Sequence, residues 1–419
     1  MDKRLRRDVI WNLAPVVLLG AVGLGMNILI AAWWHAAALG IFNLVSIAYF
    51  VLAVVGAWGI QYSVLRAVAE KPDDSAHKAA VVVGALVPNV VLAALATAIF
   101  FASRNLVARL HGSDEVAEGM LYATPGLFCF AVNKVLFGIV NGQRRMRAFA
   151  IYTSLRYVLI AVGIVAAHVM RIDAAHLPVI WTFTEGTLLL VLIGETIATV
   201  TLARAAGWQR WAREHVAYGA RGVTATLAYE IQTKLDVWMV GAAGFPKAAV
   251  GIYSLAAALN EGATQLAVVV MNNINPVMAQ SLATGRRDEV EALVRRTRRW
   301  FVPLLAGACL VGAAAFPYII PWVIGDASFQ AGALPFAILM GGLALASPYL
   351  PFAQVLLMAN RPGWHTVFVL IVVAVNFVAN LLLIPVLGLA GAALAMSIAV
   401  VTVAAMLWRL APTRAGVRL

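Results

Sequence analysis

The sequence predicts an all-α protein that crosses a membrane twelve times, with its helices arranged in two six-helix lobes. Three observations predict this fold class: a very apolar composition, twelve apolar windows of spanning length, and a short sequence match between the two halves of the chain. Of the 419 residues, 63% are hydrophobic and only 12% are charged. Soluble domains carry about 25% charged residues, so we expect lipid to cover most of the exterior.

Twelve windows of the chain are long and apolar enough to cross the hydrocarbon core, which needs about 20 residues at 1.5 Å per residue. The first follows a basic N-terminus but lacks a small-residue cleavage site, so we interpret it as an uncleaved span. The seventh window is the least apolar, and the tenth contains Pro335, Pro348 and Pro351. The windows cover residues 9–33, 39–62, 79–102, 117–140, 149–170, 178–203, 217–243, 248–275, 300–323, 331–358, 364–386 and 388–409.

The basic residues support this count and set the orientation. With the N-terminus in the cytoplasm, 24 of the 31 Lys and Arg residues fall in cytoplasmic segments or at the cytoplasmic ends of spans, and four fall in external loops. The positive-inside rule requires such an asymmetry, and a miscounted span would destroy it. We therefore expect a multi-pass plasma (inner) membrane protein with both termini in the cytoplasm. The largest cytoplasmic loop, around residues 286–299, predicts either an amphipathic helix on the inner leaflet or a solvated connector.

An internal repeat divides the chain. ALGIFNL (residues 38–44) opens the second span and AVGIYSL (residues 249–255) opens the eighth, at an offset of 211. A weaker match relates residues 141–149 to residues 360–368, at an offset of 219. Six spans per copy give a parallel repeat about an axis along the membrane normal, as in some secondary transporters. We expect an N-terminal lobe at 1–205, a cytoplasmic linker at 206–216, a C-terminal lobe at 217–410 and a cytoplasmic tail at 411–419.

Five stretches carry a resemblance to a known family. They are ALGIFNLVSIAYFVLAVVGAWGIQYSVLRAVAE, VLFGIVNGQRRMRAFAIYTSLRYVL, TKLDVWMVGAAGFPKAAVGIYSLA, VIGDASFQAGALPFAILMGGLAL and NFVANLLLIPVLGLAGAALAMSIA. Their order and spacing resemble the polysaccharide transporter family of Wzx-type lipid-linked oligosaccharide flippases. This family belongs to the multidrug/oligosaccharidyl-lipid/polysaccharide exporter superfamily. The chain lacks the two additional C-terminal helices expected of a peptidoglycan-precursor flippase, and it lacks the GxxxDxxGRR pattern of the major facilitators.

The sequence contains no pattern typical of an enzyme or a metal site. The GxxxxGK[ST] phosphate loop is absent, and the loops are too short for the aqueous domain of a glycosyltransferase. Cys129 and Cys309 both lie in apolar runs, where a lone cysteine acts as a small hydrophobe. The basic residues lie in short segments between spans, which excludes a nucleic-acid-binding surface. We therefore expect no catalytic residue, no metal and no cofactor other than a coupling ion, H⁺ or Na⁺.

Charged residues inside the spans are the candidate site residues, because each costs roughly 2.5–3.5 kcal/mol at a helix centre. Glu230 and Lys234 are at i,i+4 and can pair, whereas Asp236 points away from Lys234, toward a neighbouring helix or the outer interface. Glu261, near mid-span, is the best candidate for a titrating coupling residue. The candidate substrate-binding cations are Lys134, Arg156 and Lys234, and the candidate ion-coupling or charge-pairing carboxylates are Glu185, Glu230, Asp236 and Glu261, with Glu195 weaker.

The resemblance implies a flippase that moves polyprenyl-diphosphate-linked oligosaccharide, such as an O-antigen, capsule or exopolysaccharide repeat unit, across the plasma membrane by alternating access. Its expected partners are this lipid-linked oligosaccharide, membrane lipids and other glycan-assembly proteins. Two alternatives stay open. A drug/cation antiporter of the same superfamily would prefer an acidic cavity, and a scaffold for glycan assembly would tolerate neutralisation of every in-span charge.

The predicted topology can be tested by labelling single cysteines in a variant that lacks both native ones. Cysteines at Ser113 and Ala174 should react with an impermeant maleimide added from outside, and one at Gly285 should not. Labelling of position 285 from outside would contradict the orientation.

Overall fold

The computed structural model describes residues 3–71 and 73–419, and within them the regular secondary structure is entirely helical. The side chains of residues 3–21, 204, 225, 229, 283 and 362 lie outside the description, and so does the predicted basic cluster at the N-terminus. The contacts divide the chain into two compact units. Unit 1 comprises Met1–Trp34 and Ile41–Glu230, and unit 2 comprises His35–Gly40 and Ile231–Leu419.

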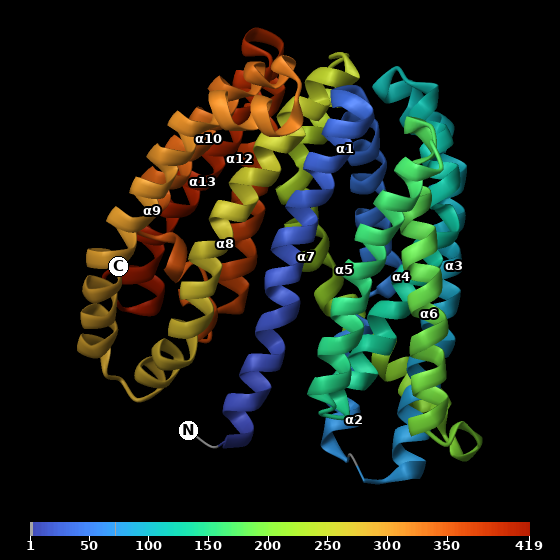
Figure 1. Cartoon of the computed structure of the whole chain (residues 1–419). Helices are drawn as coiled ribbons and strands as arrows, with labels where there is room; N and C mark the ends of the chain where they lie inside the picture. Colours follow the sequence, from blue (N-terminus) through green and yellow to red (C-terminus); the bar gives the residue numbers. More distant parts are fainter. Residues whose placement is uncertain (1–2, 72) are drawn as a thin grey trace. The chain divides into compact units, whose positions relative to one another are not determined.

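Unit 1 contains the first six predicted spans (Figure 1). Its long first helix covers two windows, because a kink at His35 (φ 69°, ψ 174°) divides the helix. The second span continues into a short helix after Gly59. The helices are α1 (Lys3–Ala57), α2 (Ile60–Glu70), α3 (Ser75–His111), α4 (Asp114–Gly142), α5 (Met146–Val169), α6 (Val179–Thr199) and the first part of α7 (Trp208–Ala242), with short turns η1 (Ala174–His176) and η2 (Leu202–Arg204).

Unit 2 holds the remaining spans. The tenth span of the chain is broken near the prolines that predicted an interruption. That span is helical as α10, then passes through a turn that contains Pro351 into the four-residue α11. The helices are α8 (Lys247–Ala283), α9 (Arg287–Ile324), α10 (Ala333–Ala346), α11 (Val355–Met358), α12 (Pro362–Leu387) and α13 (Leu389–Leu410), with the turns η3 (Ala327–Gly332), η4 (Leu350–Phe352) and η5 (Ala411–Ala415).

The predicted fold class is confirmed, with one instructive exception in apolarity. Ten helices among the described residues are long and apolar enough to span a membrane. The kinked α1 counts once among them although it covers two predicted windows. The window that fails the test is α7, the least apolar of the twelve. Polar side chains on a spanning helix need partners within the protein, so those of α7 are candidates for the functional site.

The beginning of α7 is anchored to unit 1. His215 is fully buried, with Nδ1 2.7 Å from the Ser63 hydroxyl and Nε2 3.2 Å from the carbonyl oxygen of Val81. The indole of Trp58 donates a hydrogen bond to the carbonyl of Val216 (3.2 Å). Burial lowers the pKa of His215, which keeps the imidazole neutral in this position. The two units therefore divide within α7, after Glu230, while the lobe boundaries at 205 and 217 stay a prediction.

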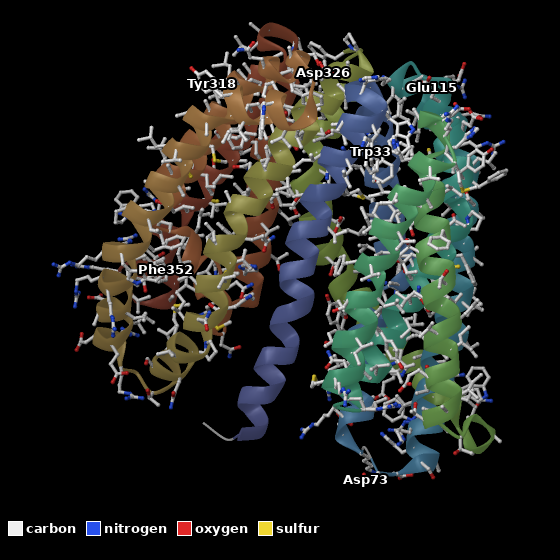
Figure 2. The ribbon with its side chains drawn as sticks, viewed as in Figure 1. Trp33, Asp73, Glu115, Tyr318, Asp326 and Phe352 are labelled. Atoms are coloured by element: carbon white, nitrogen blue, oxygen red, sulfur yellow. The ribbon has the colours of Figure 1, made fainter. Side chains whose placement is uncertain are left out.

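The ends of unit 1 follow the predicted loops. Figure 2 shows Asp73 and Glu115 at opposite ends of this unit, which α3 connects. The carboxylate of Asp74 caps α3 by accepting hydrogen bonds from the backbone N–H groups of Ala76 (3.0 Å) and His77 (2.9 Å). The hydrogen bond from His77 is the main reason that the pKa of Asp74 lies below its usual value.

The cytoplasmic loop before the ninth span is helical but does not match either interpretation. It is the first part of α9 itself. Its apolar face, Val290 and Val294, is buried in a core that also contains Phe352 and the C-terminal Val417. Protein rather than the inner leaflet therefore covers the apolar face, and the arginines occupy the outer faces of the same helix. Arg298 donates to the carbonyl of Pro348 (2.8 Å).

The internal repeat appears as a direct contact between equivalent glycines. Gly40 and Gly251 pack backbone against backbone within unit 2, which includes the His35–Gly40 segment of α1. A Cβ atom on Gly40 would overlap the carbonyl oxygen of Lys247, and one on Gly251 would overlap that of Ala36. Since these two carbonyls are themselves related by the offset of 211, the contact is two-fold symmetric.

The weaker repeat match is shifted by three residues in the structure. Arg144 (φ 55°) and Asn360 (φ 56°) are the left-handed residues of their turns. In each turn an arginine follows and caps the next helix, α5 or α12. The structural offset is therefore 216 rather than 219, because the equivalence is set by turn geometry and not by the matching asparagines.

Gly251→Ala should destabilise the protein, because the added methyl group has no room at the glycine contact. Overpacking of this kind costs about 1–3 kcal/mol. Gly262→Ala in the same helix is the matched control, because nothing lies within 4 Å of its added Cβ and alanine favours the helix by about 1 kcal/mol. Thermal unfolding of both variants in detergent should show a lower Tm for Gly251→Ala only. Equal melting would contradict the contact.

Candidate functional site

A buried ion pair occupies the interior of unit 1. The guanidinium of Arg156 on α5 contacts the carboxylate of Glu185 on α6 through both Nε (2.8 Å) and Nη2 (3.0 Å). The side-chain amide of Asn133 on α4 donates to the same carboxylate (2.8 Å) and to the backbone carbonyl of Glu185 (2.9 Å). Glu185 is 1% exposed. Its charge is therefore neutralised within unit 1, which matches the charge-pairing role among its candidate roles.

Aromatic rings line the same region and carry the second cation of unit 1. The Arg156 guanidinium carbon lies 4.9 Å from the ring centroid of Phe130 and 5.0 Å from that of Phe137. The ammonium of Lys134 lies 5.0 Å from the Phe130 centroid. No carboxylate of the described residues lies within 4.0 Å of Lys134. Its charge is therefore stabilised by a ring face, a contact that a phosphate oxygen could supplement without first displacing an anion.

Glu195 has partners at the inner end of α6. It forms an ion pair with Arg145 and accepts a hydrogen bond from the Tyr152 hydroxyl (2.8 Å). The pair links α6 to the start of α5, so Glu195 holds two helices together.

The second charged centre lies in unit 2 and joins α7 to α8. The ammonium of Lys234 is 2.8 Å from the carboxylate of Glu261, and the two side chains are 28% and 47% exposed. Lys234 therefore has a carboxylate partner other than its i,i+4 neighbour Glu230. Glu261, the candidate coupling residue near mid-span, is therefore part of an ion pair. Glu230 itself is half-buried at the point where α7 leaves unit 1.

Asp236 meets a neighbouring helix, as its direction on α7 predicted. It is 2% exposed and accepts a hydrogen bond from the hydroxyl of Tyr253 on α8 (2.5 Å). Its other oxygen, Oδ1, has no hydrogen-bond partner among the described residues. Tyr253 occupies the repeat position of Phe42, so the hydroxyl that holds Asp236 belongs to one copy only.

Sequence reasoning missed the uncharged partners. Asn133 completes the centre in unit 1 and Tyr253 binds Asp236 in unit 2. Both lie in apolar runs, where a single amide or phenol is the only signal. Two exposed amides on α8, Gln265 and Asn272, were also overlooked. No group of three or more His, Cys, Asp and Glu in the described part of the chain could hold a metal ion. Cys129 and Cys309 are free thiols.

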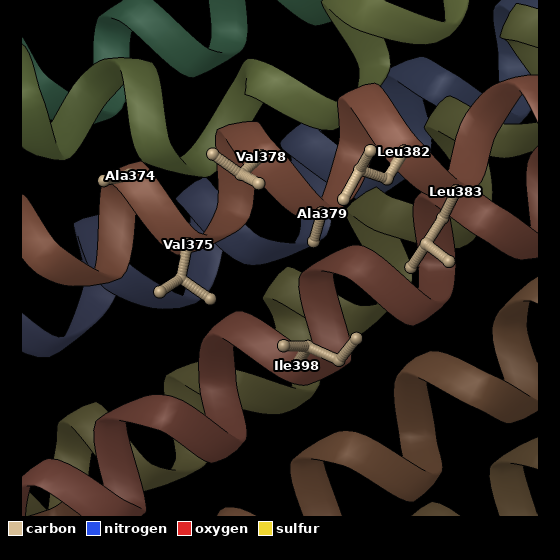
Figure 3. A pocket seen from close by; sticks show the side chains of 7 residues that line it. All are labelled: Ala374, Val375, Val378, Ala379, Leu382, Leu383 and Ile398. Carbon is tan, nitrogen blue, oxygen red and sulfur yellow. The ribbon is translucent and has the colours of Figure 1, made fainter.

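An apolar groove of about 480 Å³ lies on unit 2, between α12 and α13 (Figure 3). It is lined by α12 side chains between Ala374 and Leu383 and by Ile398 of α13. Such a lining offers a surface to a hydrocarbon chain and no partner to a charged group. The groove is therefore separate in character from the two charged centres.

The comparisons with known proteins agree with this architecture. A family model described as "Polysaccharide biosynthesis protein" matches residues 29–327. No curated protein matches the chain. The family match covers most of unit 1 and continues through α8 and α9 of unit 2, so it includes both charged centres.

Three solved structures with a similar fold are distant from this chain in sequence. The lipid II flippase MurJ, in an inward closed conformation, is 14% identical with a TM-score of 0.74, over 96% of this chain and 87% of that one. An inward-facing multidrug resistance MATE family transporter of the MOP superfamily is 13% identical with a TM-score of 0.73, over 98% of both chains. A MOP superfamily transporter from Pyrococcus furiosus is 14% identical with a TM-score of 0.55, over 97% of this chain and 94% of that one.

Proposed function

Because the chain belongs to the polysaccharide biosynthesis protein family, we propose that it is a flippase for polyprenyl-diphosphate-linked oligosaccharide in the plasma membrane. The observation that carries this proposal is Lys234, a partly exposed cation on the least apolar spanning helix. The expected substrate has a diphosphate with two or three negative charges, a polar glycan and a long lipid tail. The fold shared with a lipid II flippase supports the same class of substrate.

The ion pair of Lys234 suits transient binding of a diphosphate. Glu261 neutralises the ammonium of Lys234 at 2.8 Å, so the cation is stable within its predicted span. A diphosphate brings more negative charge than one carboxylate and competes for the same ammonium. Lysine is a point charge on a flexible stem, whereas the planar fork of arginine binds phosphate in a bidentate and tighter way. Lysine therefore favours release as well as binding.

Lys134 is the proposed diphosphate-binding cation of unit 1. It stacks on Phe130 and has the aromatic environment that a desolvated cation tolerates. The Nε and Nη2 groups of Arg156 both contact the Glu185 carboxylate, so in our proposal Arg156 has a structural role and Lys134 contacts the substrate.

A coupling ion would act through the same pair. Protonation of Glu261, or Na⁺ binding to it, would remove the carboxylate that holds Lys234 and so change its affinity for the diphosphate. Substrate binding and ion binding would then be linked through a single contact. Asp236, whose Oδ1 has no hydrogen-bond partner in the part of the chain that the structure describes, is the second candidate for the ion.

The alternative is a drug/cation antiporter, and the likeness to MATE transporters favours it. In that case Glu261 would bind the cationic substrate and Lys234 would release it. The two proposals predict opposite effects of removing Lys234. Its removal would abolish binding of an anionic substrate, whereas it would free the Glu261 carboxylate to bind a cationic substrate.

Lys234→Ala should stop glycan export in cells at normal protein abundance, because the diphosphate loses its cation. Lys234→Arg should retain part of the export, because the charge remains. Lys71→Ala, which removes an exposed lysine of the loop between α2 and α3, is the control and should export normally. Surface glycan can be measured together with protein abundance by immunoblot. Full export by Lys234→Ala would refute the proposed role.

Glu261→Gln should make transport independent of the ion gradient, because an amide neither titrates nor carries charge. Flipping of a lipid-linked oligosaccharide in proteoliposomes, with and without an imposed H⁺ or Na⁺ gradient, measures this directly. The wild-type protein should respond to one gradient and the variant to neither. An unchanged response in Glu261→Gln would assign coupling to another carboxylate, with Asp236→Asn as the next variant.

A further inference from the structure

Helix α8 presents three chemically distinct arcs between Asn260 and Met278. At 100° per residue, its buried side chains form one arc, its exposed apolar side chains form a second, and a third carries exposed polar side chains within about 40° of one another. The buried arc contains Asn260, Ala267, Met271, Ile274 and Met278, the apolar arc contains Leu266, Val269 and Val277, and the polar arc contains Glu261, Gln265 and Asn272.

The polar arc is open and its amides are unused. Gln265 and Asn272 are exposed, and no hydrogen bond joins either amide to another described residue. Asn273, one residue further along, faces the apolar arc, and its amide donates to the carbonyl of Val269 (2.8 Å). The amide beside the apolar arc is thus satisfied within its own helix, as lipid requires. The two amides of the polar arc must instead meet water or a polar ligand.

The polar arc extends along α8 from the Lys234–Glu261 pair toward the inner end of the helix. Glu261, bound to Lys234, stands at one end, and Asn272 lies 11 residues further toward the inner end of the helix. This separation corresponds to about 16 Å of helix. Beyond Glu261 the polar residues of the arc, Gln265 and Asn272, are uncharged. The arc is therefore suited to a neutral ligand.

We propose that the polar arc of α8 is the glycan subsite of the transporter and selects neutral sugars, an inference that rests on the proposed function. A sugar hydroxyl is both a donor and an acceptor, and so is a carboxamide. With the diphosphate at Lys234, the first sugars extend along Gln265 and Asn272. The lysine binds the diphosphate, which all such lipids share. The amides bind the sugars, which distinguish a glycosylated lipid from the bare carrier.

The test compares two lipids on the purified full-length protein in detergent. One probe is polyprenyl diphosphate, and the other is polyprenyl diphosphate that carries a neutral disaccharide. The wild-type protein should bind the glycosylated probe about tenfold more tightly, as expected from a few added hydrogen bonds. The double variant Gln265→Ala/Asn272→Ala should lose this preference while its affinity for the bare carrier stays within about twofold. Asn273→Ala is the matched control and should keep the preference.

Each outcome separates the inference from the proposed function. Binding of neither probe by the wild-type protein would refute the flippase proposal and the subsite with it. Equal binding of both probes by the wild-type protein, or an intact preference in the double variant, would overturn the subsite alone. If the double variant does not purify, Gln265→Glu/Asn272→Asp keeps the side-chain shapes but removes both donors, and it should likewise weaken binding of the glycosylated probe only.

Discussion

A charge inside a bilayer has to find its partner within the protein, and the packing of both units depends on this constraint. In unit 1, Arg156, Glu185 and Asn133 come from three different helices and meet at one point. In unit 2, Lys234 and Glu261 join α7 to α8, and Asp236 meets Tyr253 across the same pair of helices. Each contact fixes the rotation of one helix against another, because lipid offers no substitute partner. The polar side chains thus determine which faces of the apolar helices meet.

The spans could be predicted from sequence because length and apolarity are local properties. All twelve windows are helical over most of their length, with the tenth interrupted near its prolines. Even the low apolarity of the seventh corresponds to the polar character of α7. Partner choice is different, because it depends on how helices are rotated against each other. The spacing of Glu230 and Lys234 predicted a pair along one helix, whereas the carboxylate of Glu261 comes from 27 residues away. Likewise, the periodicity of residues 290–294 identified an apolar face but not whether lipid or protein covers it.

The cations of the two units are stabilised differently, and this bears on function. Arg156 has a bidentate carboxylate and two aromatic rings, so it has little freedom to exchange partners. Lys134 has a ring face, and Lys234 has a partly exposed carboxylate. A transport path needs contacts of intermediate strength, because a group that binds too firmly stops the cycle. The distribution of arginine and lysine matches a division between structural and exchangeable charge.

The glycine contact in unit 2 has a consequence for the history of the chain. After a duplication, most positions in the two copies are free to diverge independently. Gly40 and Gly251 are not, because each excludes a side chain from the other's backbone, and no substitution in one copy creates room for a substitution in the other. Ancestral similarity therefore persists in the heptapeptides that contain them, while the surrounding spans drift apart. The stretch that identifies the repeat in the sequence is therefore also the stretch in which its two copies are in contact.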